Sequence, residues 1–118
     1  MSEMIRITDR KKLLGALGLA VNASRAVVGV ELVCSALKAG GAKAPRLVIS
    51  ACDVSDNTRK RIGDKCSFYK VKRIEISISA QELASALGKS APIGAVGIVD
   101  ESFCRLVEQY LEYDNDNL

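Results

Sequence analysis

One glycine between a β-branched run and an amphipathic segment constrains this chain more than any other feature. Two valines lead into Gly29, and the apolar residues that follow recur at helical spacing: Val30, Val33, Cys34 and Leu37. A glycine at such a turn leaves room for another backbone to approach. The helix that begins there also offers free N–H groups and a positive dipole end to an anion. A plain packing turn has the same pattern, so both interpretations stay open.

Strand-like and helix-like segments alternate along the rest of the chain. Apolar runs at 47–52 and 93–99 predict covered strands, and the strict alternation of 71–78 predicts a strand near a sheet edge. Helices are predicted for the four stretches whose inner faces are apolar and whose starts carry capping residues, at 10–22, 57–68, 80–87 and 101–111. We therefore predict an α/β fold, a three-layer α/β/α sandwich around a four-stranded mixed sheet, in one domain over 1–118. Residues 112–118 are expected to be an acidic, frayed tail.

Composition excludes several classes of protein. The 118 residues are 48% hydrophobic and 26% charged, which is typical of a globular chain. No apolar run approaches the roughly 18 residues that a membrane span needs, and the start of the chain lacks the apolar core of a secretion signal. We expect a cytoplasmic monomer with no membrane partner.

Catalysis and metal binding are poorly supported. The chain has no histidine, and its four cysteines are far apart: Cys34, Cys52, Cys66 and Cys104. They are interpreted as small core residues, so no metal site, cofactor or small-molecule substrate is expected. Asp53 and Asp56 follow a predicted strand but suit a helix cap, and the five aromatic residues fall mostly on predicted buried faces. We predict that the protein is not an enzyme and has no catalytic residue.

Charge is distributed unevenly along the chain. Residues 10–73 hold 14 basic and four acidic side chains, whereas the residues from 74 onward hold two basic and eight acidic ones. This asymmetry predicts a basic surface that meets an anionic polymer. The alternative is a set of evenly solvated lysines, because halves of a sequence need not become faces of a fold. The run 59–61 poses the same choice between phosphate contacts and a solvated helix face.

Two stretches carry a resemblance to a known family. The residues from Asp53 to Val71, and the pattern Glu82-Leu83-x-x-Ala86-Leu87-Gly88-Lys89, resemble the small bacterial YlxQ-type proteins. These are relatives of the ribosomal protein superfamily (L-seven-Ae type) that binds kink-turns in RNA, and the resemblance covers residues 12–111. It implies a three-layer α/β/α fold and non-catalytic binding of structured RNA, with the ribosome as a candidate partner.

The resemblance also implies a site. In the superfamily, a G-x-N-E-x-x-K motif at the strand-to-helix turn works with a loop before the last strand. Only the glycine is kept here, as Gly29, because the motif's polar positions hold Glu31, Leu32 and Ser35. A carboxylate accepts hydrogen bonds but does not donate as an amide does, and a leucine side chain does neither. The second loop corresponds to 89–93, and Arg25, Lys38 and Lys43 are predicted as flanking phosphate contacts. The predicted RNA-binding residues are therefore Arg25, Gly29, Val30, Glu31, Leu32, Ser35, Lys38, Lys43, Lys89, Ser90, Ala91, Pro92 and Ile93.

A second function from another class remains open. The same fold can serve as a protein-interaction module that has lost the kink-turn motif and uses Leu32 as an apolar contact. An apolar surface around an exposed Leu32 favours the protein partner. A basic surface around Gly29, with the 89–93 loop beside it, favours RNA.

Overall fold

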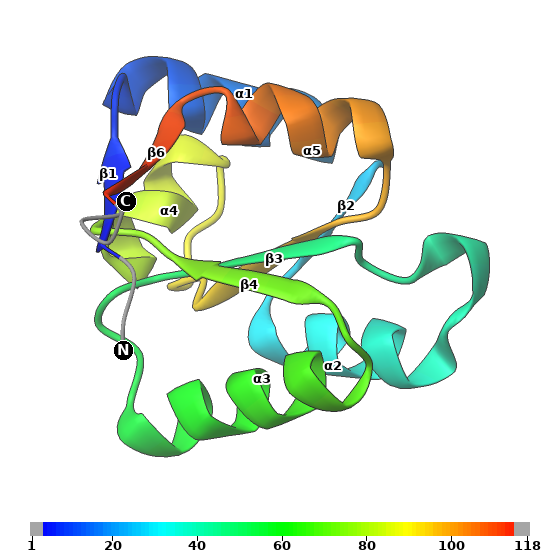
Figure 1. Ribbon diagram of the computed structural model, residues 1–118. Helices are drawn as coiled ribbons and strands as arrows, with labels where there is room; N and C mark the ends of the chain where they lie inside the picture. Colours follow the sequence, from blue (N-terminus) through cyan, green and yellow to red (C-terminus); the bar gives the residue numbers. More distant parts are fainter. Residues whose placement is uncertain (1–3, 115–118) are drawn as a thin grey trace.

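The computed structural model describes residues 4–114 (Figure 1). In chain order the elements are β1 (Met4–Ile7), α1 (Arg10–Asn22), β2 (Ala26–Val28), α2 (Val30–Ala39), the 3-10 turn η1 (Gly41–Lys43), β3 (Leu47–Ser50), α3 (Asp56–Phe68), β4 (Lys72–Glu75), α4 (Ala80–Ala86), β5 (Ala95–Ile98), α5 (Glu101–Glu108) and β6 (Leu111–Asp114). No helix in this part of the chain is long and apolar enough to cross a membrane.

The central sheet has four strands in the order β2-β5-β3-β4. β5 lies antiparallel to both β2 and β3, while β4 runs parallel to β3. The sheet is therefore mixed, as predicted, and β4 is an edge strand, also as predicted. The other edge strand is β2, which leads directly into the Gly29 turn.

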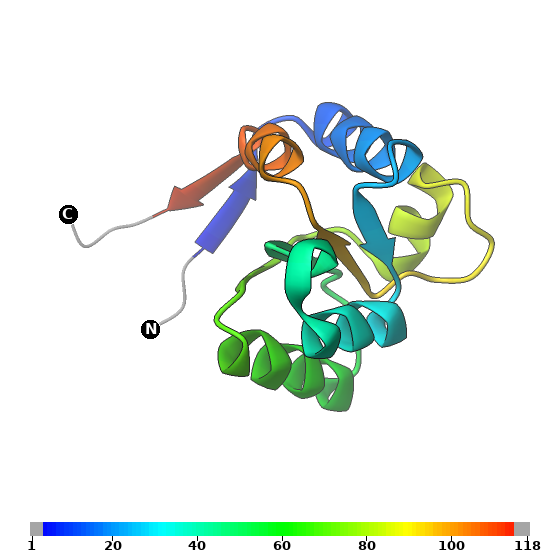
Figure 2. The same ribbon diagram turned by 90° about the vertical axis from the view of Figure 1, so that its right-hand side faces the viewer.

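Helices cover both faces of this sheet, which confirms the predicted three-layer sandwich. α2 and α3 lie on one face, and α1, α4 and α5 lie on the other (Figures 1 and 2). Each face has its own apolar core. The side chains on one strand point alternately into the two cores, so Ile49 of β3 joins the α1 side and Val48 joins the α2 side.

Two glycines, Gly97 on β5 and Gly94 just before it, leave room for neighbouring side chains to pack closely on the sheet. A Cβ on Gly97 would lie 2.8 Å from Cγ of Pro45 and 3.5 Å from Cγ2 of Val33 on α2. A Cβ on Gly94 would lie 2.9 Å from Cγ2 of Val30. A methyl group at Gly94 would therefore collide with Val30 at the start of α2, whereas one at Gly97 would collide with Pro45.

The predicted capping residues start α1, α4 and α5, whereas α3 is capped by Ser55 and not by Asp56, which is its first helical residue. Asp9 accepts a hydrogen bond from the backbone N–H of Lys12 at 3.0 Å. The equivalent acceptors are Ser55 for α3, Ser79 for α4 and Asp100 for α5. Each bond joins residues three apart and satisfies an N–H that the first helical turn leaves free.

One predicted feature is wrong at the end of the chain. Residues 112–114, expected to be part of a frayed tail, pair with β1 as the antiparallel strand β6, and 115–118 lie outside the described residues. Leu111 is only 7% exposed in the core on the α1 side. The Tyr113 ring lies 4.6 Å from the ammonium of Lys72. The strand forms because its partner comes from the other end of the chain, which no local pattern reveals.

Two predictions of burial are also wrong. Cys34, Cys66 and Cys104 are buried as expected, but Cys52 lies exposed beyond the end of β3. Phe68 is 77% exposed, because it is the last residue of α3 and does not lie on the buried face of that helix, which carries Ile62 and Cys66.

Candidate functional site

The turn at Gly29 joins β2 to α2 in a conformation that other residues avoid. Its φ is +102° and its ψ is 148°, a region populated almost only by glycine. Its N–H donates to the carbonyl oxygen of Ala95 at 2.8 Å, which fixes the turn to β5. A Cβ here would meet no atom of the described chain within 4 Å. Glycine is therefore needed for the backbone conformation and not for a close approach by the chain's own backbone, and the space beside it is open.

A surface hollow of about 570 Å³ brings this turn together with the loop before β5. Of the residues implied by the resemblance, it is lined by Gly29, Leu32, Lys89, Ala91, Pro92 and Ile93. Arg25, Val30, Glu31, Ser35, Lys38, Lys43 and Ser90 are not among its lining residues. The hollow is mostly apolar, with Lys89 as its charged lining residue among those described.

Four lining residues were missed by sequence reasoning: Val21, Ala26, Val27 and Val28. They come from the end of α1 and from β2. Because β2 is an edge strand, one of its sides is not covered by another strand. The short β-branched run before Gly29 was visible in the sequence, but its position at a sheet edge was not.

Adjacent residues on the first turn of α2 face different surroundings. Leu32 is 61% exposed and lines the hollow. Glu31 instead binds Arg61 on α3 through two bonds, Nη1 to Oε2 at 2.7 Å and Nη2 to Oε1 at 2.8 Å. This pairing holds the pKa of Glu31 below its usual range, so the carboxylate stays charged and its charge is offset by Arg61. The implied site residue Glu31 is thus already engaged on the α3 side.

The four implied cations Arg25, Lys38, Lys43 and Lys89 are all exposed, and none has an ion-pair partner within residues 4–114. The run 59–61 differs, since Arg59 binds Glu75, Lys60 binds Asp64 and Arg61 binds Glu31. That run is a solvated, paired helix face. The run with the densest sequence pattern is therefore largely neutralised, whereas these four cations, of which Lys89 lines the hollow, remain available to an anion.

Ion pairs within the fold neutralise part of the charge asymmetry of the sequence. Ion pairs join basic residues before position 74 to acidic residues after it: Arg10–Glu82, Arg46–Glu101, Arg59–Glu75, Lys72–Glu108 and Arg73–Glu75. The basic residues in these pairs are neutralised within the fold, so the predicted basic surface depends on the cations that remain unpaired among the described residues.

The arrangement suits binding better than chemistry. The α2 N-terminus has no side-chain cap among the described residues, so its first N–H groups are available to an anion. Burial raises the pKa values of the Cys66 and Cys104 thiols to about 11, which makes both poor nucleophiles at neutral pH. No group of three metal-ligating side chains is close enough to hold a metal in the described part of the chain.

This mixed sheet between two helical layers, with a glycine-initiated helix beside the loop before β5, defines the class of the protein. The chain belongs to the ribosomal protein L7Ae/L30e/S12e/Gadd45 family, whose model matches residues 11–107.

Within that family the chain is similar to YlxQ-type bacterial proteins, as the sequence resemblance predicted. It is 34% identical over 104 residues to RNA-binding protein YlxQ of Enterococcus faecium, covering 88% of this chain and 95% of that protein. The identity to RNA-binding protein YlxQ of Bacillus subtilis (strain 168) is 36% over 98 residues, covering 81% and 91%. A solved structure of a Bacillus halodurans protein of unknown function superposes with a TM-score of 0.74 at 31% identity, covering 86% of this chain and 97% of that one.

Proposed function

We propose that this protein binds structured RNA without catalysing a reaction, through the hollow between the Gly29 turn and the Lys89–Ile93 loop. The observation that carries the proposal is the shared hollow, which joins an uncapped helix start to a loop that carries an unpaired lysine. The chain's similarity to two bacterial proteins named as RNA-binding proteins supports the proposal.

Each part of the hollow has a role in this proposal. The free N–H groups at the start of α2 and the ammonium of Lys89 bind phosphate oxygens. Leu32, Ala91 and Pro92 pack against an extruded nucleotide. Arg25, Lys38 and Lys43 contact flanking phosphates.

The RNA in this proposal is a kink-turn-like element or another ribosomal or non-coding RNA. Leu32 has no hydrogen-bonding group in its side chain, and Glu31 is held by Arg61. The protein is therefore expected to recognise the shape and backbone of the RNA more than a sheared G·A pair.

Filter binding with three RNAs tests the proposal: a standard kink-turn, the same RNA with its G·A pairs disrupted, and total ribosomal RNA. We expect binding to structured RNA, with a modest loss when the G·A pairs are disrupted. With about six phosphate contacts, affinity should fall by about two to three decades between roughly 50 and 200 mM salt. Absence of binding to all three RNAs at low salt would contradict the proposal.

A matched pair of variants locates the site. Lys89→Ala should weaken binding to all RNAs alike and reduce the salt slope by about one unit. Lys60→Ala removes a lysine that is paired with Asp64 on α3, so it should leave both quantities unchanged. Equal effects of the two variants would remove Lys89 from the site.

A second candidate function, a protein-interaction module, is favoured by one observation. Leu32 is 61% exposed beside a mostly apolar hollow, which is the surface expected of a protein contact. Leu32→Lys separates the two functions, because it should abolish an apolar protein contact, whereas RNA binding should persist: the attraction of the added cation to phosphate offsets the lost packing of Leu32 against the nucleotide. If no RNA binds wild-type protein or Leu32→Lys, the protein-interaction function is the better account.

A further inference from the structure

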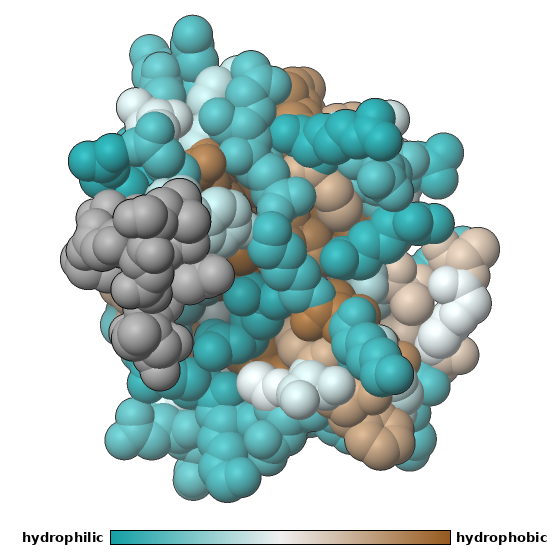
Figure 3. Space-filling view, viewed as in Figure 1, coloured by the Kyte–Doolittle hydropathy of each residue, from teal (hydrophilic) through white to brown (hydrophobic). Residues whose placement is uncertain are grey.

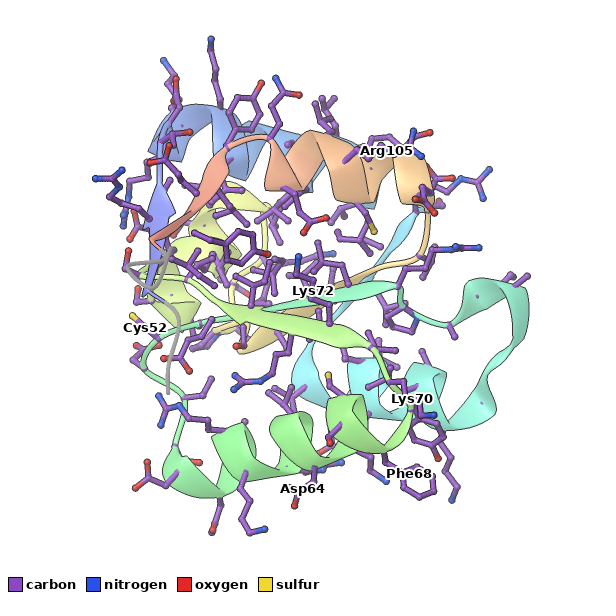
Figure 4. The ribbon with its side chains drawn as sticks, in the orientation of Figure 1. Cys52, Asp64, Phe68, Lys70, Lys72 and Arg105 are labelled. Atoms are coloured by element: carbon purple, nitrogen blue, oxygen red, sulfur yellow. The ribbon has the colours of Figure 1, made fainter. Side chains whose placement is uncertain are left out.

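An aromatic side chain stands exposed at the end of α3, on a surface that the proposed site does not use. Phe68 is 77% exposed, and Figure 4 shows it pointing outward beyond the last turn of the helix, with Lys70 following on the same side. The space-filling view shows apolar surface at this end of the molecule (Figure 3). The ring borders a hollow of about 460 Å³, which is also lined by Arg61, Asp64, Lys65 and Tyr69.

The ring of Phe68 contacts the ring of the next residue, Tyr69. Tyr69 packs against the core on the α2 side, and its ring meets that of Phe68 at a centroid distance of 4.9 Å and an angle of 84°. In such a T-shaped pair the face of only one ring is covered. At least one face of Phe68 is therefore left uncovered by Tyr69.

Two cations beside this ring lack a partner within residues 4–114, namely Lys65 and Lys70. The other charges around the hollow are compensated, because Arg61 pairs with Glu31 and Asp64 pairs with Lys60. The surface around the exposed ring is therefore positively charged.

Lys70 occupies a backbone position where glycine is usual. Its φ is +59°, and the N–H of Val71 donates to the carbonyl oxygen of Cys66 at 2.8 Å, the closing bond of a Schellman motif. A glycine there would close the helix with less strain. A lysine in this position puts an exposed cation without an ion-pair partner among the described residues at the same end of α3 as the exposed ring.

We propose that Phe68, with Lys65 and Lys70, binds an unpaired nucleotide of an RNA strand, the base stacking on the ring and the lysines contacting its phosphates. Every base has a face that stacks on an aromatic ring, and flanking cations follow the backbone. The positive surface matches a nucleic acid better than an apolar protein segment. We further infer that this nucleotide belongs to a single-stranded flank of the RNA bound at the Gly29 hollow, and this second step rests on the proposed function.

One RNA can reach both places. The longest dimension of the molecule is 37 Å; at the stacked spacing of about 3.4 Å per nucleotide a flank of about 11 nucleotides spans this distance, and an unstacked strand needs fewer. A structured RNA with a single-stranded flank of that length is therefore the natural probe, and the same RNA without its flank is the control.

A tryptophan reporter tests stacking directly. The chain contains no tryptophan, so Phe68→Trp creates a single tryptophan, which can be excited selectively over the three tyrosines, and keeps a stacking surface. A single-stranded oligonucleotide of about eight residues should quench its fluorescence in a saturable, salt-sensitive manner. Leu19→Trp, at a position on α1 that is 57% exposed, should show no saturable quenching. Equal behaviour of the two reporters would overturn the proposal.

Affinity measurements separate this inference from the proposed function. Phe68→Ala should weaken binding of the flanked RNA about ten-fold and leave the RNA without its flank unchanged. Lys70→Gly should weaken flanked RNA binding several-fold although the variant folds at least as stably. Ser24→Gly makes the same left-handed backbone change without loss of charge, since its φ is also +59°, and should not alter binding. If Lys89→Ala left the affinity for both RNAs unchanged, the proposed function alone would fail. If Phe68→Ala bound the flanked RNA as tightly as the wild-type protein does, only this inference would be overturned.

Discussion

At the scale of a residue, the backbone conformation at position 29 restricts the residue there to glycine, although there is space for a larger side chain. Gly29 has open space where its Cβ would be, yet its φ of +102° excludes other residues. Leu32 and Glu31 are neighbours on one helical turn, but one faces the hollow and the other binds α3. The spacing of the motif was visible in the sequence, whereas the direction of each side chain depended on what lies beside α2.

Gly29→Ala tests this conformational requirement. We expect it to lower the free energy of unfolding by about 1–3 kcal/mol, because the turn would have to hold alanine in a region that only glycine populates readily. Urea denaturation followed by circular dichroism measures the change.

Gly15→Ala is the matched control for this prediction. Gly15 lies within α1, and its added Cβ would also meet no described atom within 4 Å. Alanine should stabilise that helix by roughly 0.5–1 kcal/mol. If both substitutions stabilise the protein, the conformation assigned to Gly29 is wrong.

At the scale of an element, the local sequence predicts where helices start, but it does not predict that strands from the two ends of the chain pair. Helix starts depend on hydrogen bonds between residues three apart, such as Asp100 to Phe103, so the sequence contains the whole cause. β6 depends instead on β1, which pairs Ile7 with Leu111. A four-residue strand carries too little periodicity to be recognised without its partner.

Leu111→Ala tests whether β6 is a true structural element. Since Leu111 is 7% exposed in the larger core, its truncation should cost about 2–4 kcal/mol of unfolding free energy. Glu112→Ala, at an exposed position on the same strand, should cost less than about 1 kcal/mol because it removes a surface ion pair with Arg6. A frayed tail would make both substitutions nearly silent in thermal or urea denaturation.

At the scale of the whole molecule, the two cores contain thiols that stay protonated well into the alkaline range. Burial raises the pKa values of Cys66 and Cys104 from 9.0 to about 11. As pH rises above 9, the unfolded chain loses these protons while the folded chain keeps them. Stability due to the thiols is therefore complete below pH 9 and is lost as pH rises toward 11.

Urea denaturation at pH 8, 9, 10 and 11 measures this loss. Each unit of difference in pKa is worth about 1.4 kcal/mol, so we expect a fall of several kcal/mol over the series. The double variant Cys66→Ala, Cys104→Ala starts from lower stability but should show a shallower decline with pH. Parallel declines for the two proteins would show that other groups cause the alkaline sensitivity.

The sequence by itself determined the alternation of strands and helices, the capped helix starts and the family resemblance. These features follow from periodicity and from hydrogen bonds between near neighbours, which the order of residues contains directly. It also marked Gly29 as the turn on which the proposed site depends.

Only the tertiary structure decided which residues meet. It placed the Gly29 turn beside the Lys89–Ile93 loop, paired the run 59–61 with carboxylates, and left Phe68 uncovered. The physical reason is that burial and ion pairing depend on contacts between segments far apart in the chain. Such contacts are set by how α2 and α3 pack on the sheet, and no local pattern records them.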